Sequence, residues 1–261
     1  MNKKLIDRGK HFFMSLVGLA ALLLVWDIAV RFTDLGNLFP SPISVAGGLF
    51  QSFYEPLGHY TILIHLQFSM IRVLTGFALG SGVGLLFGLL IGRSQMAEAI
   101  VRPLFEIIRP IPSVAWIPMA IIWFGIGDES RIFIIFMAAF ANMVQNVYTG
   151  ARRVDKELIG VAQMLGANGW KTYLYVVLPS CVPFIFAGLH VALATSWMAV
   201  LAAEMIAATE GVGFVITAGQ EEANMVQVLV GIVVISLVGL LLASIMHKIE
   251  TILCRWRKKG A

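Results

Sequence analysis

Long apolar segments dominate the pattern of hydrophobic and polar positions. A helix needs about 20 mainly apolar residues to cross the hydrocarbon core of a membrane. Six segments meet this requirement, at residues 11–30, 73–92, 103–125, 131–149, 179–205 and 226–247. The third and the fifth contain prolines, so we expect them to be the least regular. The pattern predicts an all-α fold, a polytopic bundle of six transmembrane helices forming one domain over residues 1–261.

The polar segments between the spans predict how the bundle is oriented. Acidic residues collect in the segments at 126–130 and 207–225, whereas basic residues collect in both tails and in the loop at 150–178. The positive-inside rule then places both termini and the loop at 150–178 in the cytoplasm. A further helical pattern at about 60–72 is expected to lie along the outer surface before the second span. The basic residues of the C-terminal tail are Arg255, Arg257, Lys258 and Lys259.

Composition supports a membrane location. Hydrophobic residues make up 59% of the chain and charged residues only 13%, against about 25% charged residues in a typical soluble domain. The net charge of +4 is explained by basic residues on the cytoplasmic side of the spans. We therefore expect the lipid bilayer, and no nucleic acid, as a partner, and a multi-pass protein of the plasma or inner membrane.

Five glycines in the second span recur at every fourth position. Residues four apart lie on the same face of a helix, and small residues let membrane helices approach closely. The spacing predicts a face on which another helix packs. The five are Gly76, Gly80, Gly84, Gly88 and Gly92.

The third span carries a charge among its prolines. In lipid, carbonyls freed by proline need partners in protein or a watery cavity, so we expect this span to be buried and to line an aqueous path. Arg109 either faces that path or snorkels to the headgroups, and Glu106 is a candidate partner for it. Glu204, which ends the fifth span, either lines the outer gate or makes a helix packing contact. The candidate path residues are Arg109, Pro110, Pro112, Trp116 and Glu204.

The basic loop at 150–178 has the pattern of a short amphipathic helix, a glycine turn and a second short helix, which together we call the helical knob. Apolar residues at helical spacing form one face, Gly166 is a stop signal, and a second short helix is expected at 170–177. Pro179 then opens the fifth span, where a first-turn proline is tolerated. Something must cover this apolar face. The periodicity does not decide between a partner protein, the protein's own spans and the membrane surface. The face consists of Val154, Leu158, Val161, Ala162 and Leu165.

The same loop resembles the cytoplasmic signature of ATP-binding-cassette importer permeases, Glu-Ala-Ala-x3-Gly-x9-Ile-x-Leu-Pro. The matching residues are Ala162, Gly166, Leu178 and Pro179, with Val176 in place of isoleucine. The chain departs from the signature at its start, where Gly160 and Val161 replace the glutamate and the first alanine. Docking is therefore expected to depend on helix shape and the apolar face, and not on a signature carboxylate.

The resemblance implies importer-permease topology, with a core at about 65–250, and a coupling helix that sits in a cleft of an ATPase subunit. It also implies a second copy of this chain, two ATPase subunits and an external solute-binding protein. ATP and Mg²⁺ would be used by the ATPase, with no cofactor in this chain. The residues expected to dock are Glu157, Leu158, Val161, Ala162, Leu165, Gly166 and Ala167.

Other segments resemble the subgroup that imports taurine, alkanesulfonates, nitrate or bicarbonate. They are Arg109-Pro-Ile-Pro-x3-Trp116-Ile-Pro118, Trp123-Phe-Gly-Ile-Gly127 and Ala203-Glu204-x-Ile-Ala-Ala. The resemblance implies a permease subunit that forms the path for a small, anionic solute. Related members carry thiamine-precursor pyrimidines or aromatic acids, which is the alternative substrate class.

Two other functional classes fit the sequence less well. An ion-coupled secondary transporter usually shows inverted repeats, and none stands out. An enzyme needs converging reactive side chains, whereas the five histidines are scattered; His190, deep in the fifth span, is expected to be a packing residue. There is no phosphate-binding G-x-x-x-x-G-K-[ST] motif and no metal-binding spacing of Cys or His. We therefore expect neither catalysis nor a metal in this chain.

Overall fold

The computed structural model describes residues 2–37, 39–206 and 208–254, with side chains described in 13–34, 36, 39–155, 157–206 and 208–254. Apart from one isolated β-bridge between Leu57 and Tyr60, the regular structure in these ranges is helical. Five helices are long and apolar enough to cross a membrane, and a bent pair can provide a sixth. The prediction of an all-α membrane bundle is confirmed, with five or six candidate spans. The basic tail at 255–259 lies outside the described residues, and the orientation of the termini stays a prediction.

The described chain separates into two compact units. The first comprises residues 1–63 and 215–234. It contains α1 (Asn2–Phe32), a 3₁₀ turn, η1 (Asp34–Asn37), α2 (Pro42–Gln51), most of α10 (Val212–Glu221) and the start of α11 (Met225–Leu253). Ser41 caps α2 by accepting a hydrogen bond from the amide of Ser44, and a proline at the first helical position suits this start.

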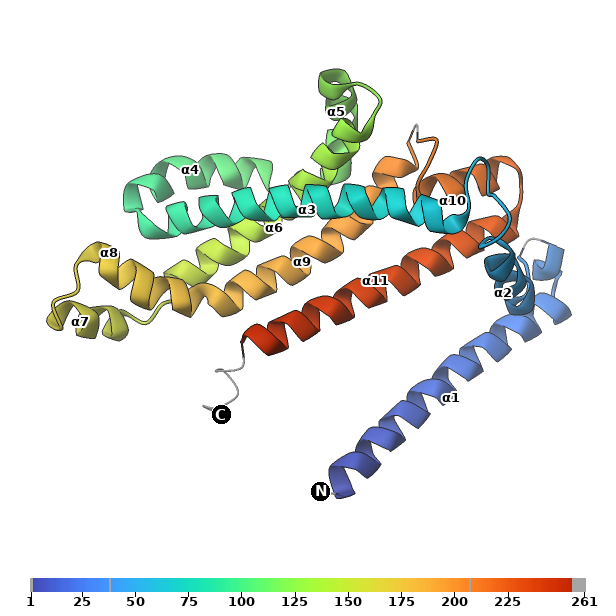
Figure 1. Ribbon diagram of the computed structural model, residues 1–261, viewed down its shortest axis with the longest axis horizontal. Helices are drawn as coiled ribbons and strands as arrows, with labels where there is room; N and C mark the ends of the chain where they lie inside the picture. Colours follow the sequence, from blue (N-terminus) through green and yellow to red (C-terminus); the bar gives the residue numbers. More distant parts are fainter. Residues whose placement is uncertain (1, 38, 207, 255–261) are drawn as a thin grey trace. The chain divides into compact units, whose positions relative to one another are not determined.

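The second unit, residues 64–214 and 235–261, contains the remaining helices. Within it, α6 and α9 pack along each other (Figure 1). Their core includes Ile134, Ile135 and Trp197, which are buried with side chains of α3, α5 and the later part of α11. The other elements of this unit are α3 (Ile62–Arg93), α4 (Gln95–Ile108), η2 (Ser113–Trp116), α5 (Ile117–Phe124), α6 (Asp128–Arg152), α7 (Lys156–Met164), α8 (Gly169–Thr172), η3 (Tyr173–Val177) and α9 (Leu178–Glu204).

The structure differs from the prediction at the start of α3 and in the stretch before α11. The segment at 60–72 was expected to be a separate surface helix, and this is wrong because α3 runs without a break from Ile62 to Arg93. Its polar side chains His65, Ser69 and Arg72 are buried in the protein, so they do not hold the segment at a surface. The helix α10 also forms inside the stretch at 207–225 that was predicted to be a loop.

The third predicted span is broken where its prolines cluster. α4 and the segment Ser113–Phe124 meet at an angle of 86°. Pro112 has no backbone N–H, and a residue that precedes a proline is disfavoured in helical conformation, so the helix ends before Ile111. Pro103 lies inside α4, and Pro118 lies in the first turn of α5, where proline is tolerated.

The five glycines of α3 face α6. A Cβ built at any of them would lie within 2.8 Å of an α6 atom, closer than real Cβ contacts come. The opposing side chains on α6 also recur every fourth residue, so the two helices meet along matching rows of positions. These side chains are Ile135, Ala139, Met143, Val147 and Ala151, in the order of the glycines.

Candidate functional site

The loop after α6 folds as the helical knob that its pattern predicts. Asp155 caps α7 by accepting a hydrogen bond from the amide of Glu157 at 3.0 Å. Gly166 adopts φ +82°, and the amides of Gly166 and Ala167 donate to the carbonyls of Gln163 and Ala162, both at 3.0 Å. These two bonds form a Schellman motif, in which a left-handed glycine ends a helix. α7 and α8 lie beyond the ends of α6 and α9 in Figure 1.

One face of α7 is apolar and uncovered in the described chain. Met164 is 89% exposed and Leu165 is 83% exposed, and Leu158 and Val161 are each more than half exposed. Ala162 is only partly exposed. Met164 was not named from the sequence, although its spacing from Leu158 and Val161 is helical, so the same periodicity could have found it.

The inner side of the knob is attached to α3. The Arg93 guanidinium, at the end of α3, lies 4.4 Å from the centre of the Trp170 ring and 5.4 Å from that of Tyr173. The Tyr173 hydroxyl donates to the carbonyl of Leu89 at 2.9 Å. The π-helical turn η3 then leads into α9, two residues before Pro179, whose ring would crowd a regular helical turn.

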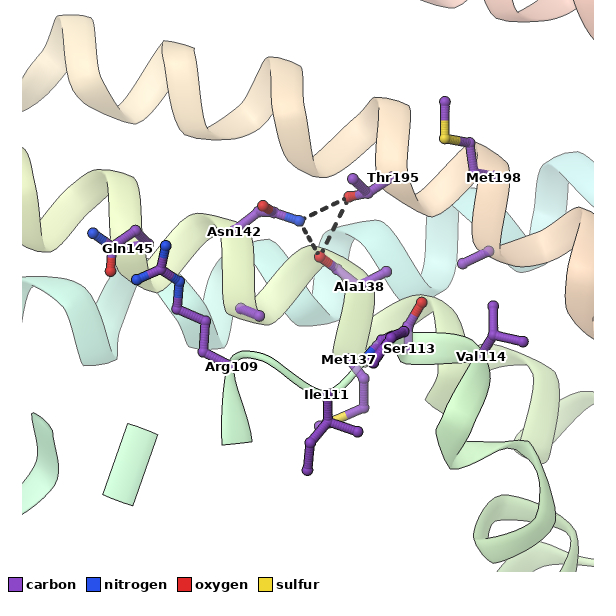
Figure 2. Close-up of a pocket in the computed structure, with 13 residues that line it drawn as sticks. Arg109, Ile111, Ser113, Val114, Met137, Ala138, Asn142, Gln145, Thr195 and Met198 are labelled. Carbon is purple, nitrogen blue, oxygen red and sulfur yellow. Dashed lines mark hydrogen bonds between the residues drawn. The ribbon is translucent and has the colours of Figure 1, made fainter. Parts of the chain in front are cut away.

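A cavity of about 380 Å³ opens beside the break between α4 and η2. Its polar lining comes from α6, α9 and the break (Figure 2). The Asn142 amide donates to Thr195 Oγ1 at 3.1 Å and to the carbonyl of Ala138 at 2.8 Å, which joins α6 to α9 at the wall of the cavity. Arg109 and Gln145 line the same space.

The structure brings only some of the predicted path residues together. Arg109 and Pro112 line the cavity, whereas Pro110, Trp116 and Glu204 are not among its lining residues. The expected partnership of Glu106 with Arg109 is wrong, because Glu106 pairs with Arg102 one turn earlier at 2.7 Å. Arg109 forms no ion pair with any residue in the ranges that the structure describes.

Glu204 belongs to a buried polar network that the sequence did not reveal. Its side chain is 1% exposed and lies 2.9 Å from an Arg72 nitrogen, and the Arg72 side chain is 2% exposed. Ser69 Oγ lies 2.8–2.9 Å from both carboxylate oxygens, and the Gly213 amide donates to one of them at 3.1 Å. This environment fits the packing alternative for Glu204.

Arg72 joins four parts of the second unit. Besides Glu204 on α9, its guanidinium contacts Asp128 at the start of α6 at 2.7 Å and Glu210 in the segment before α10 at 2.8 Å. His65 Nδ1 accepts from the Gly211 amide at 3.1 Å. His65, Ser69 and Arg72 follow helical spacing on one face of α3, which is the signal that could have marked them as a buried face.

These features define a polytopic helical membrane protein with a polar cavity beside a broken span and an exposed helical knob. Residues 80–251 match the family model described as the binding-protein-dependent transport system inner membrane component. The chain belongs to this family. It is a multi-pass permease subunit of an ATP-binding-cassette importer, a transport component and not an enzyme, and it acts with an ATPase and a solute-binding protein.

Similar proteins support this assignment over nearly the whole chain. The chain is 33% identical to the taurine transport system permease protein TauC of Escherichia coli, covering 95% of this chain and 91% of that protein. It is 30% identical to the nitrate import permease protein NrtB of Synechocystis sp., over 90% of this chain and 87% of that protein. A chain from inward-facing structures of the MetNI methionine ABC transporter has a similar fold, with a TM-score of 0.58 and 20% sequence identity. The match covers 72% of this chain and 92% of that chain.

Proposed function

We propose that this chain forms the translocation path for a small anion, such as a sulfonate or nitrate, in a homodimer served by two ATPase subunits. A solute-binding protein delivers the anion, and the path runs between the two copies. The observation that supports an anionic substrate is the position of Arg109. Its guanidinium lines the cavity and has no acidic partner among the described residues. An intramembrane charge of this kind is rare and normally faces a cavity or a partner.

A neutral polar group of the cavity complements this charge. Gln145 lines the cavity beside Arg109 (Figure 2), and among the described residues only one of its two amide hydrogens is used, in a bond to Thr149 at 3.4 Å. An anion that enters the cavity can accept a hydrogen bond from this amide while the guanidinium balances its charge. A relative of this chain, TauC, is named for taurine, and another, NrtB, for nitrate, and both solutes carry an anionic group.

Docking of the ATPase is the second part of the proposal. The apolar face of α7 supplies the contact, because it places Leu158, Val161, Met164 and Leu165 at an exposed surface. ATP binding closes the ATPase subunits and moves α7. The Arg93 and Tyr173 contacts pass that movement to α3, and η3 passes it to α9, so that the path opens alternately to each side.

The path is tested with Arg109→Gln and Arg109→Lys. We expect Arg109→Gln to lower the uptake of a sulfonate or nitrate by at least about 10-fold, the equivalent of about 1.4 kcal/mol, with Arg109→Lys retaining more uptake. Uptake is measured in proteoliposomes with the ATPase and the binding protein. Unchanged uptake of every tested anion by Arg109→Gln would remove this residue from the path.

Docking is tested separately with Leu165→Asp, which puts a charge on the exposed face of α7. We expect this variant to lose copurification with the ATPase while remaining folded. The matched control is Ile126→Asp, because Ile126 is 70% exposed and precedes the opposite end of α6. Equal copurification by both variants would contradict docking through α7.

A further inference from the structure

Three metal-ligating side chains converge where α9 meets the later part of α11. His190 Nε2 lies 3.0 Å from a Glu250 carboxylate oxygen, and His247 Nδ1 lies 3.9 Å from the same oxygen. The two imidazole rings are 6.4 Å apart between centroids. One donor atom from each residue lies within 4.8 Å of the other two. Spacing along the chain does not reveal the whole cluster, because His190 lies on a different helix from His247 and Glu250.

The positions of the donors are set by the helices. His247 and Glu250 are three residues apart on α11, so they share one face. His190 approaches that face from α9, which is anchored nearby by a hydrogen bond from the Trp197 indole to the carbonyl of Ile235 at 3.1 Å. A close approach of Gly239 to Trp197 holds the same two helices together. The donor set is therefore built on regular helices and not on a loop.

The spacing of the donors suits a tetrahedral metal ion. Zn²⁺ binds histidine nitrogen and carboxylate oxygen at about 2.0–2.2 Å, which separates its ligands by about 3.3 Å in a tetrahedron. The separations of the two imidazole nitrogens from the Glu250 oxygen, 3.0 Å and 3.9 Å, lie on either side of that value. All three side chains are partly or largely exposed in the described chain, so no packed neighbour there prevents them from closing on an ion.

The chemistry of the donors selects among metals. Two imidazoles and one carboxylate suit Zn²⁺ and similar transition ions, whereas Ca²⁺ and Mg²⁺ prefer all-oxygen sites. A hydrogen bond between His190 and Glu250 accounts for one of the two contacts. It does not account for the second imidazole, His247, which lies near the same carboxylate oxygen at a distance too long for a hydrogen bond.

We propose that His190, His247 and Glu250 form a site for a divalent transition metal ion, with Zn²⁺ as the ion that fits best. The ion would join α9 to α11 through one ligand on the first helix and two on the second. Because a metal that binds the folded state stabilises it, Zn²⁺ should raise the unfolding temperature of the protein. This proposal is independent of the transported solute.

The test uses the full chain, purified in detergent with a tag that contains no histidine. Zn²⁺ binding is measured by equilibrium dialysis, and thermal unfolding is followed with and without Zn²⁺. We expect about one ion per chain and a higher unfolding temperature. His190→Gln, His247→Gln and Glu250→Gln should each weaken binding by at least about 10-fold, since even changes to groups that only orient metal ligands have effects of this size.

The control is His59→Gln, because His59 is exposed and lies in the other unit. It should bind Zn²⁺ like the unmodified chain. Co²⁺ gives an independent readout, since a tetrahedral site produces visible absorption that the three ligand variants should lose. The proposal is overturned if the folded chain shows no saturable binding, or if His59→Gln weakens binding as much as His247→Gln does.

Discussion

Replacing Arg72 with methionine should destabilise the protein more than neutralising its buried partner, Glu204. Arg72→Met keeps most of the side-chain volume but leaves Glu204, at 1% exposure, without its cation. Breaking a buried ion pair by removing one member costs about 3–5 kcal/mol, because the remaining charge stays buried without a partner. We expect a loss of this size in the free energy of unfolding of Arg72→Met.

The opposite substitution, Glu204→Gln, should cost less. Arg72 keeps Asp128 and Glu210 as partners, and glutamine can still hydrogen-bond to Ser69. The expected cost is about 1.5–3 kcal/mol, the range for a hydrogen bond to a charged group. The double variant has no unpaired carboxylate at position 204. Its loss in free energy of unfolding should therefore be smaller than the sum of the losses of the two single variants, by about 0.5–3 kcal/mol.

These losses are measured by unfolding the detergent-purified variants while following the fluorescence of the six tryptophans. The comparison within one set of conditions matters more than the absolute values. The reasoning is refuted if Arg72→Met unfolds like the unmodified chain. It is also refuted if the losses of the two single variants simply add in the double variant.

Three further predictions concern packing and coupling. Gly84→Leu should lower the unfolding temperature because its position faces α6, whereas Gly82→Leu, with no neighbour within 4 Å, should not; equal effects would contradict the packing role. Gly166→Pro should uncouple ATP hydrolysis from uptake, because proline cannot adopt φ +82°, and normal coupling would count against the knob geometry. Trp170→Ala should remove about 0.5–1 kcal/mol of cation–π attraction to Arg93 and so reduce uptake per ATP hydrolysed, and an unchanged ratio would exclude this link.

Local signals in the sequence were sufficient for most of the long helices, but not for the start of α3 or for α10. The glycine period in α3, the prolines after Arg109 and the stop at Gly166 each act within a few residues of chain. Such patterns depend on a single helix or turn, so they can be read without knowing the fold. The break at 109–112 and the turn at Gly166 accordingly fall where these residues predict them.

Contacts between distant segments could not be read in the same way. Arg72 and Glu204 are on different helices, and nothing near either residue identifies the other. The segment at 60–72 was expected to lie along a surface, whereas the partners that bury its Arg72 lie on other elements. His190 and His247 looked scattered for the same reason, since only the packing of α9 on α11 brings them together.

ATP-driven uptake in proteoliposomes tests whether this chain is the permease of an ATP-driven anion importer. This chain is reconstituted with its ATPase and binding protein, and uptake of a labelled sulfonate or nitrate is followed with ATP inside the vesicles. We predict uptake that requires both the ATPase subunit and ATP, and that is lost when Leu165→Asp prevents docking. Uptake that persists in vesicles lacking the ATPase subunit would contradict this function.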